Sequence, residues 1–365
     1  MLFDPPSDPE PTAETDPVPD SSRRAFLARL ATLAATAGLG LASKSGASDW
    51  WSEPPPVNRP HWPTRSPQDW NRPPTRYWTR PPAQRWNAPP TRPWGQSWTT
   101  IDLNASIERY VWRLRQTGRL AANERTAWLV YDFVSRRFLV TINAGTPYQS
   151  ASMIKPFIAL AFFHKVQEGQ LTYTAFHRER MEAMIQRSDN RATNYFIELL
   201  NRTSRRSGPA EAEHTLKQRH PGVFRHTRIV ERIPGGGRTY RNRASALDYH
   251  RFLQALWYDQ LPYSTELRRL MYLPNRDRVY TGAVGVPRGT AVIDKTGTTA
   301  RLCGDMGILI ARGRDGRSYP YTFIGIIEKA RPTRNYWAWQ AARGDVIREV
   351  SSQVYGHLRQ MYDLV

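Results

Sequence analysis

Two residues three positions apart, Ser152 and Lys155, point to nucleophilic catalysis. They open an apolar run over 153–163, broken only by Lys155 and Pro156, which predicts a buried helix that begins near Ser152. Residues at this spacing share a helix face, so the lysine amine can reach the serine hydroxyl. A serine becomes a good nucleophile when a neighbouring base takes its proton. The pair is therefore a candidate for a serine nucleophile that a lysine base activates.

Two short motifs follow in the chain. Ser188-Asp189-Asn190 joins predicted helices over 173–187 and 192–200, where Asp189 suits a cap of the second helix. Lys295-Thr296-Gly297 follows a predicted strand segment over 291–294, with a hairpin partner over 305–310. Lys295 is a candidate for a second cation that keeps Lys155 in its neutral, basic form. Taken singly, the three motifs are also typical of a polar helix start, a helix cap and a hairpin end, so their order and context favour catalysis.

Together the three motifs resemble the active site of the penicillin-recognising serine enzymes, in particular the class A β-lactamases. The resemblance implies that Ser152 is the nucleophile and Lys155 its base. It also implies that Ser188 relays a proton to the departing nitrogen, and that Asn190 binds the amide of the substrate.

The resemblance assigns the third motif to substrate binding. It implies that Lys295 and Thr296 meet the carboxylate that β-lactams and D-alanyl-D-alanine peptides share, with Gly297 next to them in the substrate-binding strand. It places the oxyanion hole at the backbone N–H groups of Ser152 and Thr298. Arg301, further along the same hairpin, is open to two interpretations, a contact with a substrate carboxylate or a surface position.

The deacylation step departs from the class A pattern. The expected Glu-x-x-Leu-Asn is absent, and the stretch 229–235 resembles the segment just after that glutamate, which puts His226 in its place. Glu231 is the nearest acid, and Glu211 and Glu213 are further candidates in a polar segment. The alternative for His226 is a solvent-facing loop histidine. Only 36 residues separate Ser152 from Ser188, which predicts a trimmed helical lobe and a wider cleft.

Residues 100–365 have the composition of one globular domain with a substantial core. The predicted fold is α+β and β-lactamase-like: an antiparallel sheet flanked by helices, with an inserted all-helical lobe. Helices are expected over 104–116, 245–258, 265–273 and 345–362. A hairpin is expected from strands over 128–133 and 138–142, and a late strand over 321–327.

The N-terminal segment 1–47 predicts export. An acidic, proline-rich stretch is followed by Ser22-Arg23-Arg24-Ala25-Phe26-Leu27 and an apolar run over 30–42, which resembles a twin-arginine signal. This run is shorter than the about 20 residues that span a bilayer. We expect a periplasmic protein exported by the twin-arginine route, and whether the signal is cleaved stays open. The alternative is an amphipathic surface helix.

The segment 48–99 has a repeat of its own. Tryptophan recurs every eight residues, often followed by Arg-Pro-Pro, at Trp62, Trp70, Trp78, Trp86 and Trp94. This density of proline predicts a semi-rigid polyproline spacer. Tryptophan next to arginine also permits stacking on sugars. The hypothesis is a tether over 49–100 that docks on the cell wall or on another envelope polyanion, and the alternative is an inert spacer.

The composition limits partners further. The net charge of +20 favours polyanions, including acidic membrane surfaces. A nucleic-acid partner is not expected, because the chain combines an export signal with no recognised binding pattern. Cys303 is the only cysteine, so no internal disulfide forms, and we interpret it as a small core residue. No metal site and no cofactor are predicted, since the histidines lack ligand spacing.

The predicted function is that of an exported serine hydrolase that forms an acyl-enzyme on Ser152 and acts on a β-lactam or a D-alanyl-D-alanine-like cell-wall amide. The alternative is an envelope-bound penicillin-binding or sensor protein with little turnover. The complete set of Ser152, Lys155, Ser188 and Lys295 favours the first hypothesis. The missing glutamate and the repeat segment favour the second.

Overall fold

The computed structural model describes residues 102–234 and 236–365. The predictions for the signal and for the repeat segment lie outside these residues. The described part is built on a five-stranded sheet with the order β2-β1-β7-β6-β5, and all neighbouring strands are antiparallel. The strands are β1 Glu124–Asp132, β2 Arg137–Ile142, β5 Ala291–Thr298, β6 Leu302–Arg312 and β7 Ser318–Lys329.

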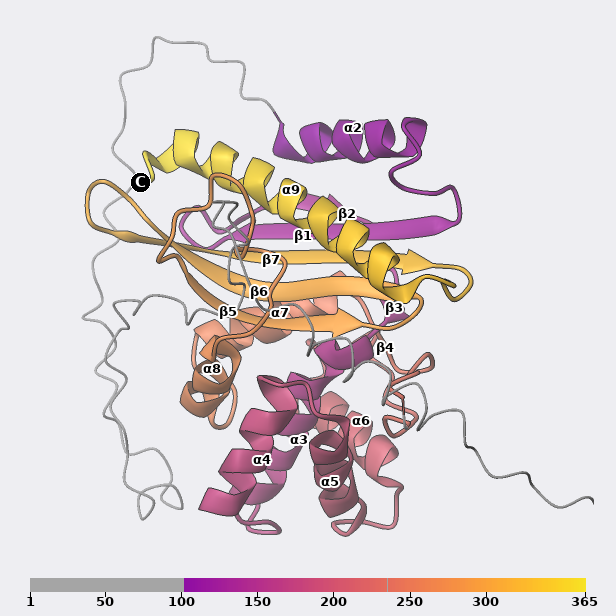
Figure 1. Ribbon diagram of the computed structural model, residues 1–365. Helices are drawn as coiled ribbons and strands as arrows, with labels where there is room; N and C mark the ends of the chain where they lie inside the picture. Colours follow the sequence, from indigo (N-terminus) through magenta and orange to yellow (C-terminus); the bar gives the residue numbers. More distant parts are fainter. Residues whose placement is uncertain (1–101, 235) are drawn as a thin grey trace, which may run out of the picture. The chain divides into compact units, whose positions relative to one another are not determined.

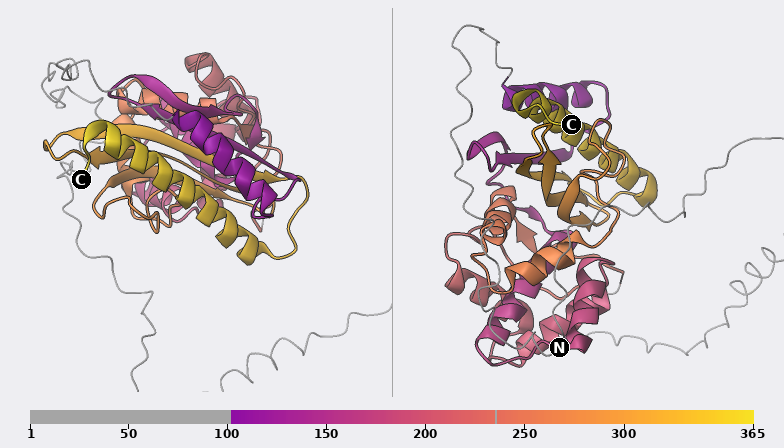
Figure 2. Two further views of the ribbon diagram at one scale, coloured as in Figure 1. Left: turned by 90° about the horizontal axis from the view of Figure 1, so that it is seen from above. Right: turned by 90° about the vertical axis from the view of Figure 1, so that its left-hand side faces the viewer.

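Helices cover both faces of this sheet. The central strands β6 and β7 are therefore buried along almost their whole length, rather than on alternate residues. On one face lie α2 (Leu103–Gln116) and α9 (Tyr336–Tyr362), seen above the strands in Figures 1 and 2. A hydrophobic core between these two helices and the sheet contains Trp128, Phe323 and Tyr355.

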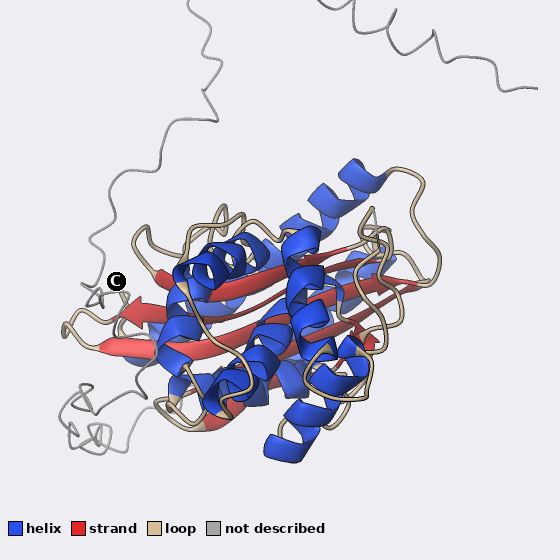
Figure 3. Cartoon of the chain, turned by 90° about the horizontal axis from the view of Figure 1, so that it is seen from below, coloured by secondary structure: helices blue, strands red, loops and turns tan. Residues whose placement is uncertain are grey.

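The opposite face carries the rest of the helices, which Figure 3 shows in front of the strands. α7 (Ala246–Trp257) and α8 (Ser264–Tyr272) pack close to the sheet. Beyond them is a helical lobe formed by α3 Lys155–Gln167, α4 Ala175–Ile185, α5 Asn190–Asn201 and α6 Gly208–Arg219. α3 is buried on nearly every side, as expected for a helix that is apolar all round, and it contacts α4, α5 and α6.

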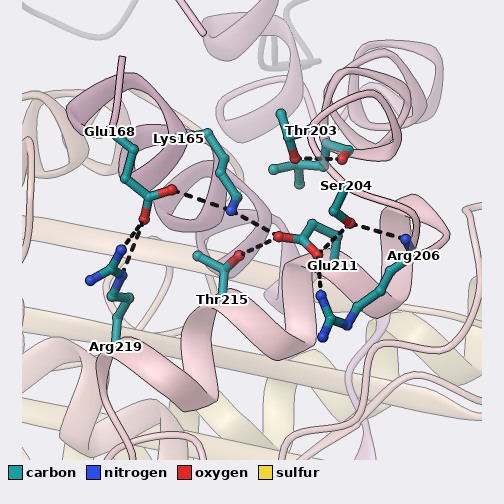
Figure 4. A network of polar contacts seen from close by, with 9 residues as sticks. Lys165, Glu168, Thr203, Ser204, Arg206, Glu211, Thr215 and Arg219 are labelled. Atoms are coloured by element: carbon teal, nitrogen blue, oxygen red, sulfur yellow. Dashed lines mark hydrogen bonds and ion pairs between the residues drawn. The ribbon is translucent and has the colours of Figure 1, made fainter. Parts of the chain in front are cut away.

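A polar network closes the lobe between α3 and α6 (Figure 4). The buried Glu211 carboxylate of α6 accepts hydrogen bonds from Ser204 Oγ at 2.7 Å and Thr215 Oγ1 at 3.2 Å, and pairs with Lys165 Nζ of α3 at 2.8 Å. Lys165 also pairs with Glu168, which binds Arg219 of α6. The network thus fixes the end of α3 that lies away from Ser152.

The predicted architecture, an antiparallel sheet flanked by helices with an inserted helical lobe, is confirmed. Differences are local. α9 begins at Tyr336, earlier than the expected 345, and α6 replaces the polar segment that contains Glu211 and Glu213. The helix expected near Ser152 begins at Lys155, after a 3₁₀ turn over Ala151–Ile154. Within residues 102–234 and 236–365, no helix has both the length and the apolar character that crossing a bilayer requires.

Candidate active site

Ser152 lies in a strained turn between the sheet region and the helical lobe. The preceding residue, Ala151, has a left-handed backbone with φ of 45°, which is uncommon for a residue with a Cβ. The short strand β3 (Tyr148–Gln149) leads into the turn and pairs with β4 (Arg243–Ala244). Ser150 N donates to Asn242 O at 2.9 Å, which anchors the turn. These contacts hold Ser152 half-buried at the start of α3.

Lys155 is fully buried and connects the first two motifs. Its Nζ donates to the backbone O of Ser188 and to Asn190 Oδ1 at 2.9 Å, and it lies 3.1 Å from the Ser188 hydroxyl oxygen. Burial and the positive charge of Lys295 lower the pKa of Lys155 to about 6, against an opposing effect of Asp189. The amine is therefore largely neutral at pH 7, as a proton acceptor must be.

No hydrogen bond of the Ser152 side chain is found within the described ranges. Its contact with Lys155 thus stays a prediction. In apo enzymes such contacts are often long and tighten only when substrate binds. The 3₁₀ turn favours them, because residues three apart are eclipsed in this helix type.

The second motif is held by its own backbone. Ser188 has a left-handed φ of 58°, which turns the chain sharply between α4 and α5. Asp189 caps α5 through a 2.6 Å bond from Ala192 N to its carboxylate, as predicted. Asn190 is the first residue of α5, and its side chain lies beside Gly237, where a Cβ would stand 3.2 Å from Nδ2.

The third motif lies on the edge strand β5, which approaches the nucleophile turn closely. A Cβ at Gly297 would stand 2.9 Å from Met153 Cγ and 3.2 Å from the backbone O of Ser150. A side chain here would push the strand away from Ser152. Glycine is thus required by the close approach of β5 to the turn, a reason that the motif alone does not reveal.

Lys295 is buried on β5, and its Nζ donates to Thr296 O at 3.1 Å. Burial lowers the pKa of Lys295 to about 8, helped by Arg278, while Asp294 and Asp305 act against this shift. Lys295 thus remains mainly charged at pH 7. It also supplies part of the field that keeps Lys155 neutral, as predicted.

Arg278 is a site residue that the sequence analysis missed. Its guanidinium donates to Thr298 Oγ1 at 2.8 Å and to Gly304 O at 3.1 Å, so it braces the end of β5 next to the candidate oxyanion hole. It comes from the irregular connection between α8 and β5, a region with no periodic pattern. Only the folded chain brings it to Thr298.

The acids considered for deacylation are all engaged in structural contacts. Glu231 Oε1 accepts from Arg241 N at 2.9 Å, and Glu211 belongs to the lobe network. Glu213 pairs with Lys217 and accepts from Ile229 N at 2.8 Å. His226, the residue at the position of the missing glutamate, lies in a loop, and 39% of its side chain is exposed.

His226 is tied to the start of α7. Its backbone N donates to Asp248 Oδ2 at 2.8 Å, and its Nδ1 lies 3.2 Å from Ser245 Oγ, the cap of that helix. These contacts give His226 a structural role in holding the loop against α7. The part of the ring that does not make these contacts faces solvent, in line with the interpretation as a loop histidine.

Cys303 is fully buried in the core beneath α9, as expected, and burial raises the pKa of its thiol to about 11.

Arg301 donates from Nε to Lys329 O at 3.3 Å, at the tip of the β5–β6 hairpin. Among the described residues, no group of three or more histidine, cysteine or acidic side chains is arranged to hold a metal ion.

Comparison with known proteins agrees with this geometry. The model of the β-lactamase enzyme family matches residues 177–358. The solved structure of PBP-A is 22% identical with a TM-score of 0.56, and the match covers 71% of this chain and 97% of that one. The chain has a β-lactamase-like fold. A β-lactamase from Desulfarculus baarsii DSM 2075 is 19% identical with a TM-score of 0.55, and the match covers 71% of this chain and 98% of that one.

An ancestral class A β-lactamase is 21% identical with a TM-score of 0.53, with 70% of this chain and 99% of the ancestor covered. No curated protein matches the sequence. In this β-lactamase-like chain the family match includes the second and third motifs but begins after Ser152 and Lys155. At these identities the structural likeness supports the fold, and the chemistry has to be argued from the site.

Proposed function

We propose that this protein is a serine hydrolase that forms an acyl-enzyme on Ser152. The observation that carries the proposal is the buried Lys155 amine, whose pKa is lowered to about 6 and which bridges Ser188 and Asn190. A buried lysine with no acidic partner in hydrogen-bond contact is costly for folding. Its position three residues after a half-buried serine makes it suited to accept the proton of that serine.

The proposed reaction begins when Ser152 Oγ attacks the carbonyl carbon of a β-lactam or of a D-alanyl-D-alanine-like amide. Lys155 takes the hydroxyl proton as the C–O bond forms. Ser188 Oγ lies 3.1 Å from Lys155 Nζ, so it can pass a proton to the nitrogen as the C–N bond breaks. The proton taken from Ser152 is thereby returned to the leaving group, and Lys155 is neutral again.

In this proposal, strand β5 binds the negatively charged group of the substrate. Lys295 and Thr296 bind the substrate carboxylate, and Asn190 binds the amide. The N–H groups of Ser152 and Thr298 receive the developing oxyanion, where one donor contributes roughly 3–4 kcal/mol to the transition state. Arg278 keeps Thr298 in place through its 2.8 Å contact.

The rate of deacylation distinguishes a penicillin-binding or sensor protein from a β-lactamase. The positions considered for a water-activating acid are engaged elsewhere, which favours an acyl-enzyme that hydrolyses slowly, as in a penicillin-binding or sensor protein. A PBP-A variant with this fold is known as an acyl-enzyme complex with penicillin G. Fast hydrolysis, as in a β-lactamase, needs another base, with Glu231 as the first candidate.

The test is an intact-mass time course of the full chain with benzylpenicillin, with Ser152→Ala in parallel. We expect an adduct that requires Ser152 and persists for minutes to hours. An adduct that clears while penicilloate accumulates assigns β-lactamase activity instead. Absence of any Ser152-dependent adduct, with benzylpenicillin and with a D-alanyl-D-alanine ester, contradicts the proposal.

We also propose export to the periplasm by the twin-arginine route, supported by the motif around Arg23 and Arg24. Such a location fits an enzyme whose substrates are wall peptides or antibiotics. Fusion of residues 1–60 to a reporter that needs twin-arginine export tests this proposal, with Arg23→Lys/Arg24→Lys as the variant expected to abolish export.

A further inference from the structure

A basic pocket lies at the end of the sheet, beyond the hairpin that follows the third motif. It has a volume of about 240 Å³ and is lined by residues from the start of β1, the end of β7, β4 and the β5–β6 turn. Four of the residues that line it are cationic: Arg125, Arg243, Arg301 and Lys329. The acids at its wall are Glu124 and Glu328.

The acids leave a surplus of positive charge. Glu328 is occupied by Arg125, whose Nε donates to it at 2.7 Å. Glu124 is paired with Arg343 of α9 at 2.6 Å, a residue outside the pocket lining. Within residues 102–234 and 236–365, Arg243, Arg301 and Lys329 form no ion pair. Three cations in one small cavity repel each other, unless an anion binds between them.

Two of the arginines are held in place by aromatic rings. The guanidinium carbon of Arg125 lies 4.4 Å from the ring centre of Tyr148, and that of Arg301 lies 5.6 Å from the ring centre of Tyr240. Arg301 is further fixed by its 3.3 Å bond to Lys329 O. Guanidinium groups that are already ordered lose less entropy when they bind an oxyanion, and their fork matches a carboxylate.

The pocket is joined to the nucleophile region. Gln149, three residues before Ser152, accepts a hydrogen bond from Thr299 Oγ1 at 3.2 Å, and its N donates to Glu328 at 3.4 Å. Arg301 follows Thr298 by three residues, so their Cα atoms are at most about 10 Å apart. A ligand group that extends past Thr298 toward Arg301 therefore has at most about 10 Å to cover before it reaches a residue that lines the pocket.

The order of residues on β5 indicates in which direction the acyl part of the substrate extends. In the proposed reaction the carboxylate of the leaving part lies at Lys295 and Thr296, and the attacked carbonyl lies at Thr298. The acyl part of the substrate is on the other side of that carbonyl, so it extends toward Thr299 and Arg301. The pocket volume is below the about 300–1,000 Å³ of sites that enclose whole small molecules, which suits a single end group.

We propose that this pocket is a subsite for a carboxylate at the end of the acyl side chain of the substrate, an inference that rests on the proposed acylation of Ser152. The preferred substrate class is then an acidic acyl donor, such as a wall peptide whose side chain carries a free carboxylate. Specificity comes from Arg243 and Arg301, which have no acid partner of their own.

The experiment compares two cephalosporins with the same nucleus, one with a glutaryl side chain that ends in a carboxylate and one with the uncharged glutaramide side chain. The rate of Ser152 acylation by each is measured on the full chain at constant ionic strength. The wild-type protein is expected to favour the glutaryl compound by about tenfold or more, as charge-assisted contacts provide. Arg301→Gln and Arg243→Gln are expected to bring the ratio of the two rates close to one.

The ratio cancels any general loss of activity in a variant. Arg205→Gln is the matched control, since Arg205 is exposed on the helical lobe and lies outside the pocket lining, and it is expected to keep the wild-type ratio. A ratio near one in the wild-type protein, or an unchanged ratio in both pocket variants, overturns the inference.

A second measurement does not depend on acylation. Glutarate is titrated by calorimetry into the wild-type chain and the same three variants. One outcome is that glutarate binds, that Arg301→Gln and Arg243→Gln abolish this binding, and that neither cephalosporin acylates the protein. This outcome keeps the subsite and rejects the proposed reaction. Acylation with no arginine-dependent preference and no glutarate binding rejects the subsite and keeps the reaction.

Discussion

Lys155 connects the first two motifs, because its amine belongs to α3 while its hydrogen-bond partners are Ser188, in the turn before α5, and Asn190, the first residue of α5. Its charge state is set by burial and by the positive charge of Lys295 on β5. Two lysines of unequal basicity therefore stand close together, one neutral and one charged near pH 7. This division matches the roles of proton acceptor and carboxylate ligand in the proposed reaction.

Acylation is predicted to depend on pH through these two lysines. Lys155 must be neutral, so the acylation rate rises with pH through about 6; Lys295 must be protonated, so the rate falls above about 8. The measurement is the second-order rate of benzylpenicillin acylation from pH 4.5 to 9.5. A rate that does not change between pH 5 and 7 contradicts the role of Lys155.

The close approach at Gly297 leads to a second residue-scale prediction. Gly297→Ala places a methyl group against Met153 and the Ser150 carbonyl, and overpacking of this kind costs about 1–3 kcal/mol. Since a shift of about 1 Å in the reacting geometry lowers rates roughly 100-fold, we expect acylation to fall by about that factor. Gly145→Ala is the control, because its Cβ meets only Leu247 Cδ1 at 3.8 Å. Equal acylation rates in the two variants would refute the requirement for glycine.

At the scale of elements, the site is assembled from one 3₁₀ turn, one inter-helix loop and one edge strand. Each is anchored by a neighbour: β3 pairs with β4, Asp189 caps α5, and β5 pairs with β6. The helical lobe must therefore stay packed for Lys155 to reach Ser188. The polar network between α3 and α6 contributes to this packing.

Glu211→Gln is predicted to destabilise the protein. The substitution removes the 2.8 Å partner of the buried Lys165, which keeps its second pair with Glu168 at 3.3 Å. Because one partner remains, we expect a loss of about 1–3 kcal/mol, which for a domain of this size lowers Tm by roughly 5 °C, measured by thermal unfolding. Glu179→Gln, at an exposed position of α4, serves as the control. A Tm equal to that of the control would show that the network adds little stability.

At the scale of the whole molecule, the chain combines a β-lactamase-like unit with an N-terminal region of very different composition. The net charge of +20 and the tryptophan repeat suit an envelope polyanion, and the basic pocket adds positive charge at the end of the sheet.

Deletion of residues 49–97 is predicted to lower retention on purified wall polymer. The reason is loss of the regularly spaced tryptophan and arginine side chains, each able to contribute about 1 kcal/mol through stacking on sugars. The measurement is a pull-down at fixed salt, with the acylation rate as a control for an intact catalytic unit. Unchanged retention would identify the repeat as a spacer only.

Most of the fold was predictable from the sequence, because its long apolar strands and helices carry periodic patterns. The helices around Leu103–Gln116 and Ala246–Trp257 and the hairpin of β1 and β2 appear close to the expected positions. α6 was not predicted, because its sequence is polar and lacks an apolar stripe; in the fold its Glu211 is buried and pairs with Lys165 of α3. The early start of α9 likewise depends on Trp339 and Arg343 binding Glu124 of β1.

For the site, the sequence by itself determined the three motifs and hence the candidate chemistry, because residue type and short spacing are local properties. Only the tertiary structure decided which distant groups meet. It brought Arg278 to Thr298, turned His226 into an anchor for α7, required glycine at 297 and gathered Arg125, Arg243, Arg301 and Lys329 into one pocket. Such contacts join residues far apart in the chain, and their energies come from burial and charge in the folded state, which no local pattern encodes.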